Sequence, residues 1–78
     1  MKIFGRVNRH CSDDGLVELS QATFVGSPDA LRNIAAFLSH AADQREQRGT
    51  RFNHSHIQDE IKNWGDHVPE WPDVVVAS

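Results

Sequence analysis

SPDALRNIAAFLSHAADQREQRG, residues 27–49, has the sequence features of both ends and of the apolar face of one long helix. Ser27 can cap the free amides of a first turn, and Pro28 suits the first helical position, where no amide partner is needed. At the other end, Arg45 and Arg48 suit the negative end of the helix dipole, and Gly49 suits a left-handed terminal residue. The pattern predicts a helix from residue 28 to residue 48.

The apolar residues of this helix recur at steps of three and four, which places them on one helical face. Polar residues lie elsewhere on the helix, namely Arg32, Asn33, Ser39, His40, Asp43 and Glu46. We therefore expect one side of the helix to lie on the core. The residues predicted for that side are Leu31, Ile34, Ala35, Leu38, Ala41 and Ala42.

The sequence before the helix predicts a β-hairpin. Residues 2–7 alternate in the two-residue period of a strand, and the turn-forming cluster Ser-Asp-Asp-Gly at 12–15 follows. Residues 16–25 form the second strand, but their apolar residues change parity between Leu19 and Ala22. A bulge near Ser20 and Gln21 would return these side chains to one face.

The sequence after the helix has two interpretations over residues 51–58, as a strand or as a helix, and we favour a strand. Residues 59–64 can form a short helical turn, and the glycine and prolines of 65–72 interrupt any regular element. The β-branched run at 73–77 predicts a final strand. The expected fold is α+β, in the order β-β-α-β-β, as a single domain over residues 1–78. We expect a small antiparallel sheet with the long helix packed on one face.

Composition restricts the class of protein. The chain has 78 residues and a single cysteine, Cys11, so a disulfide framework cannot stabilise it. The sequence contains neither an N-terminal leader pattern nor an apolar run near the length of a membrane span. These observations lead us to expect a cytoplasmic, bacterial protein that does not bind membranes.

The charge is unevenly distributed. The net charge is −3, and residues 1–49 balance to zero. From residue 50 onward there are two basic residues, Arg51 and Lys62, and five acidic residues. Their difference accounts for the whole net charge. An acidic field repels phosphate backbones and attracts basic protein surfaces, so we expect a protein partner and no nucleic acid.

Two tryptophans stand in this acidic segment, which makes it the candidate binding surface. Aromatic residues with charged neighbours are common anchors of protein interfaces, although in a small domain each tryptophan can also close the core. The candidate partner-binding residues are Asp59, Glu60, Trp64, Asp66, Glu70 and Trp71.

Other chemistry has weaker signals. On a strand, His54 and His56 would point to the same face and could bracket a metal ion, but they are weak candidates because no third ligand stands at a diagnostic spacing. His10 beside Cys11 lacks an orienting third group, so we expect no catalytic residues, no enzyme activity and no cofactor.

Three short patterns resemble immunity protein family thirty-two of bacterial polymorphic toxin systems. They are Leu31-x-x-Ile34-Ala35-x-x-Leu38, Phe52-x-His54-x-His56 and Pro72-Asp73-Val74-Val75-Val76. The resemblance implies an intracellular protein that binds and blocks a cognate toxin domain, without catalytic residues. The alternatives are a small metal-binding domain centred on the histidine pair, or a homo-oligomeric structural domain such as a homodimer.

Overall fold

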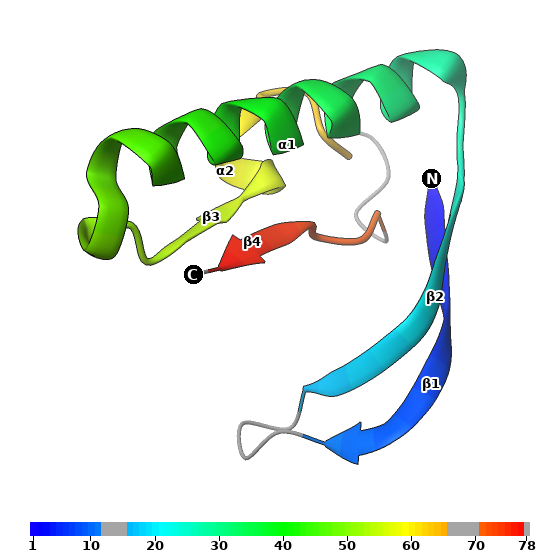
Figure 1. Cartoon of the computed structure of the whole chain (residues 1–78). Coiled ribbons are helices and arrows are strands. Elements are labelled where there is room, and N and C mark those ends of the chain that lie inside the picture. The colour runs from blue at the N-terminus through cyan, green and yellow to red at the C-terminus, as the bar shows by residue number, and fades with distance from the viewer. Residues whose placement is uncertain (12–15, 66–70, 78) are drawn as a thin grey trace.

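The computed structural model of the chain, shown in Figure 1, describes residues 1–11, 16–65 and 71–77. It has a small α+β fold, as predicted. The elements, in chain order, are β1 (Lys2–Cys11), β2 (Val17–Val25), α1 (Pro28–Arg48), a 3₁₀ turn η1 (Gly49–Arg51), β3 (His54–His56), α2 (Ile57–Glu60) and β4 (Val75–Ala77).

Both predicted ends of α1 are confirmed. The Oγ of Ser27 accepts a hydrogen bond from the amide of Ala30 at 3.2 Å, and Pro28 begins the helix. Gly49 follows the helix with φ 57°, and its amide donates to the carbonyl of Arg45. Because L side chains rarely adopt that φ, glycine suits this position.

The predicted hairpin and its bulge are confirmed as well. β1 pairs with β2 antiparallel, with Arg6 opposite Gln21 and Val7 opposite Leu19, which leaves Ser20 as the extra residue. The Oγ of Ser20 donates to the carbonyl of Arg6 at 3.4 Å. The turn predicted at residues 12–15 lies outside the described residues.

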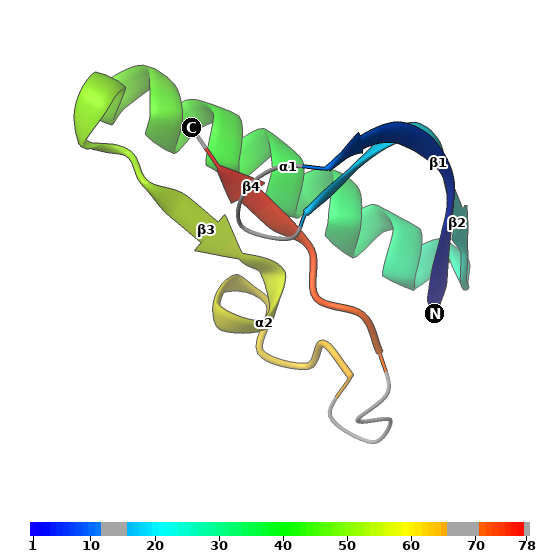
Figure 2. The same cartoon turned by 90° about the horizontal axis from the view of Figure 1, so that it is seen from below.

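The strands differ from the prediction in one respect. Within residues 1–11, 16–65 and 71–77 they form two separate two-stranded sheets, β1–β2 and β3–β4, rather than one. β3 and β4 are three residues long and pair antiparallel with Ser55 opposite Val76. The hairpin adjoins the N-terminal end of α1 and stands apart from β3 and β4, as Figure 1 shows. Figure 2, seen from below, shows β3 and β4 side by side, and Figure 1 shows both beneath α1.

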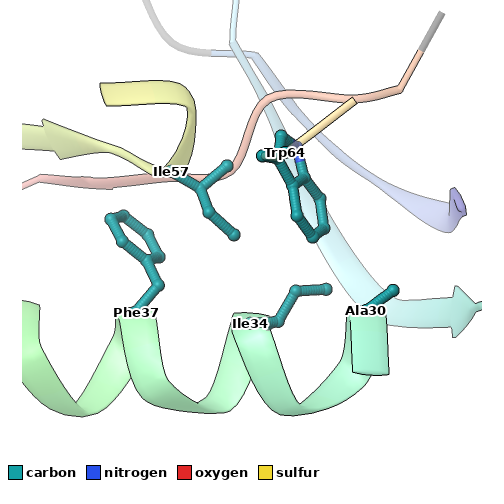
Figure 3. Packing of buried hydrophobic residues seen from close by; sticks show 5 residues of the cluster. All are labelled: Ala30, Ile34, Phe37, Ile57 and Trp64. Carbon is teal, nitrogen blue, oxygen red and sulfur yellow. The ribbon is translucent and has the colours of Figure 1, made fainter. Parts of the chain in front are cut away.

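The core lies between α1 and the C-terminal third. In Figure 3, Ala30, Ile34 and Phe37 point from α1 toward Ile57 and Trp64. Phe37 and Ile57 are the largest fully buried side chains among the described residues. Residues packed against this cluster are Met1, Ile61, Trp71, Val74 and Val76.

The prediction of which helix face is buried is partly wrong. Ile34 and Ala41 are buried, but Leu31, Ala35, Leu38 and Ala42 are exposed, and Ala30 and Phe37 take their place. The two stripes share Ile34 and Ala41, and their centres differ by about 75° around the helix. The C-terminal third covers the stripe of Phe37, and Leu38 is 43% exposed.

Candidate functional site

The candidate site is the acidic surface formed by α2 and the residues just before β4. Asp59 and Glu60 lie on α2, and Trp64 lies in the turn that follows. Trp71 and Asp73 lie in the extended segment that leads into β4. Asp66 and Glu70, which were also predicted, lie outside the described residues. We call Asp59, Glu60, Trp71 and Asp73 the acidic site.

The two tryptophans have different environments. Trp64 is 7% exposed and belongs to the core cluster. Its indole Nε1 donates a hydrogen bond to the carbonyl of Pro72 at 2.9 Å. Trp71 is half-buried and meets Trp64 edge to face, with ring centroids 4.9 Å apart. Trp64 thus holds the segment of Trp71 in place, and Trp71 is the tryptophan that can contact a partner.

The carboxylates of the site face histidines. The Nδ1 of His56 lies 2.5 Å from the Oδ2 of Asp73, and the Nε2 of His40 lies 3.7 Å from the Oε2 of Glu60. The hydrogen bond to Asp73 is the main cause of a raised pKa at His56. Desolvation opposes this shift, and the charges of Asp73 and Asp59 add to it.

Glu60 is also bound to β3. Its Oε1 accepts a hydrogen bond from the Oγ of Ser55 at 3.5 Å, and Ser55 is the buried polar residue of β3. Asp59, the other acid on α2, is exposed. The side chain of Glu60 is 34% exposed.

Sequence reasoning missed Asp73, His40 and the pairing of His56 with Asp73. These partners lie 17 and 20 residues apart in the sequence, and only strand pairing and helix packing bring them together. The sequence patterns of two short strands do not by themselves say that the strands pair. In the structure Val75 lies opposite His56, and Asp73 precedes Val75 by two residues in the chain.

The histidine pair lies as predicted on one face of β3. The rings of His54 and His56 meet edge to face with centroids 5.0 Å apart, and the buried Ser55 points the other way. Over residues 1–11, 16–65 and 71–77, no group of three or more His, Cys, Asp or Glu side chains is arranged to hold a metal ion. One ring nitrogen of His56 is already bound to Asp73.

Comparisons of the chain with protein-family models, curated proteins and solved structures found no match. The resemblance to immunity protein family thirty-two thus stays a prediction. A search of the described helices found none with the length and apolar character needed to cross a bilayer.

Proposed function

We propose that this chain is a non-catalytic protein-binding domain of the immunity type, which binds and neutralises a cognate toxin domain through the acidic site. The observation that carries the proposal is Trp71, a half-buried aromatic residue held against Trp64 and followed by Asp73. Interface anchors are commonly large aromatic residues with a polar rim.

The charge of the site favours a basic partner. Asp73 contacts His56 and Glu60 contacts His40, and the C-terminal third carries the whole net charge of the chain. Such a field speeds the encounter with a basic surface and disfavours polyanions. Toxin domains that act on nucleic acids have basic surfaces for the same electrostatic reason, so they fit the site best.

Rigidity also supports this proposal. The hydrogen bond from Trp64 to Pro72 and the contact of His56 with Asp73 fix the segment of Trp71 at two points. A surface that is already ordered loses less conformational entropy when it binds.

Co-expression tests the proposal. A toxin domain encoded beside the gene for this chain should stop bacterial growth when expressed alone, and growth should recover when the chain is co-expressed. The purified pair should form a complex, and Trp71→Ala should weaken it about 30-fold or more. If the neighbouring reading frames encode no toxin and co-expression rescues growth from none of the candidates, the proposal fails.

A further inference from the structure

The hairpin carries an apolar face along residues 3–7 of β1 and residues 17–24 of β2. Residues directly opposite each other on paired strands share a face, and three such pairs are Ile3 with Phe24, Gly5 with Ala22, and Val7 with Leu19. Val17, two residues before Leu19, lies on the same side. We call this set the apolar hairpin face; its members are Ile3, Gly5, Val7, Val17, Leu19, Ala22 and Phe24.

Gly5 lets Leu19 lie flat across this face. A Cβ at position 5 would come within 2.7 Å of the Cδ1 of Leu19, so a larger residue would displace that side chain. The opposite face is more polar, since it pairs Lys2 with Val25, Phe4 with Thr23 and Arg6 with Gln21. The hairpin is thus amphipathic.

The bulge preserves this face. Val17 and Leu19 have one sequence parity, whereas Ala22 and Phe24 have the other. If β2 were a regular strand in which Ser20 paired like its neighbours, Leu19 would point to the polar side, because a shift of one residue reverses every side chain. The bulge therefore keeps all seven residues on a single side.

This face lies open to solvent. Val7 is 68% exposed and Leu19 is 47% exposed, and no residue of β2 is buried. The hairpin stands away from the core in Figure 1, and among the described residues the buried core comes from α1 and the segments after it.

The size of the exposed surface indicates how much remains to be covered. The chain exposes 6206 Å², whereas a folded monomer of 8.8 kDa exposes about 4,800 Å². Its radius of gyration is 13.5 Å, against about 11.5 Å for a compact domain of this length. The excess of about 1,400 Å² exceeds the roughly 800 Å² that each partner buries in a stable complex.

We propose that a second copy of this chain covers the apolar hairpin face, so that two hairpins pack face to face about a twofold axis. The charges of residues 1–26 sum to zero, so two such segments do not repel each other, whereas a basic partner is drawn to the acidic C-terminal third. Two apolar sheet faces pack about 10 Å apart, as in a β-sandwich. The inference does not rest on the proposed toxin binding.

Sedimentation equilibrium tests this inference. The wild-type chain should have twice the mass of 8.8 kDa at micromolar concentrations. Leu19→Lys places one charge in each half of the interface. At about 30-fold for each copy, it should raise the dimer dissociation constant about 1,000-fold. The matched control is Leu38→Lys, because Leu38 is similarly exposed but lies on α1. It should leave the dimer intact.

A second measurement needs no substitution. In a mixture of ¹³C-labelled and unlabelled wild-type chains, isotope-filtered spectra should show contacts between chains at the methyl groups of Leu19 and Val17. A wild-type monomer at all concentrations would overturn the inference. So would a dimer that survives Leu19→Lys, or one that Leu38→Lys dissociates equally well. A monomer that still neutralises its toxin would overturn the dimer alone and leave the proposed function standing.

Discussion

The indole Nε1 of Trp64 donates a hydrogen bond to the carbonyl oxygen of Pro72, 2.9 Å away. This bond joins the turn after α2 to the segment that leads into β4, eight residues later in the chain. The same indole packs on Ile34 and Ile57 in the core cluster. Trp64 is therefore both a core residue and the support of the acidic site.

Removing that hydrogen bond should destabilise the fold. Trp64→Phe keeps an aromatic ring but deletes the donor and some buried area, and it should cost about 2 kcal/mol. The matched change at the half-buried neighbour, Trp71→Phe, should cost less than about 1 kcal/mol. Urea denaturation of both variants measures the difference. Equal midpoints for the two variants would show that the indole donor contributes nothing.

Truncation of two adjacent helix residues should destabilise the fold to very different extents. Phe37 is fully buried, so Phe37→Ala should cost about 3–5 kcal/mol, a large share of the stability of so small a domain. Leu38→Ala should cost less than about 1 kcal/mol, because Leu38 is exposed. Thermal unfolding followed by circular dichroism compares the two. A larger loss of stability for Leu38→Ala than for Phe37→Ala would show that the helix face predicted from the sequence is the buried one.

These two residues show where sequence reasoning reaches its limit. The ends of α1 were predictable because a cap is a local interaction, made within four residues of Ser27 or Gly49. The choice between the stripes of Phe37 and Leu38 was not, because both have helical spacing. It depends on which stripe Ile57 and Trp64 cover, and these lie far along the chain.

The strands likewise have local features that the sequence predicts and long-range pairings that it does not. The bulge at Ser20 was predictable from the change of parity between Leu19 and Ala22, which is written in the sequence. The separation of the hairpin from β3 and β4 was not, because strand patterns do not say which strands pair. The contact between His56 and Asp73 was missed for the same reason.

The contact between His56 and Asp73 should make stability depend on pH. The hydrogen bond to Asp73 raises the pKa of His56 above its usual value of 6.5, so the folded state favours the protonated ring. The stabilisation should be fully present below pH 6.5 and disappear as pH rises through the raised pKa. Urea midpoints of the wild type and Asp73→Asn, measured from pH 5 to 9, should differ most at the acidic end.

A histidine variant provides the control for this pH dependence. His56→Gln removes the titrating group, so its midpoint relative to Asp73→Asn should not change over the same range. The imidazole resonances of His56 should also titrate at a higher pH in the wild type than in Asp73→Asn. A stability difference between the wild type and Asp73→Asn that stays constant from pH 5 to 9 would contradict the assignment.

The charged residues and the aromatic anchor of the acidic site should affect different rates of toxin binding: the charges the association rate, and the anchor the dissociation rate. Asp59 is exposed on α2, so Asp59→Lys should slow association with the toxin domain and weaken its dependence on salt. Trp71→Ala should instead speed dissociation about 30-fold, or about 2 kcal/mol, because a half-buried aromatic anchor determines residence time. Glu46→Lys, the same charge reversal near the end of α1, is the control and should change the association rate less. Surface plasmon resonance at several salt concentrations measures both rates. If Asp59→Lys and Glu46→Lys slow association equally, net charge alone steers the partner and the acidic site has no special role.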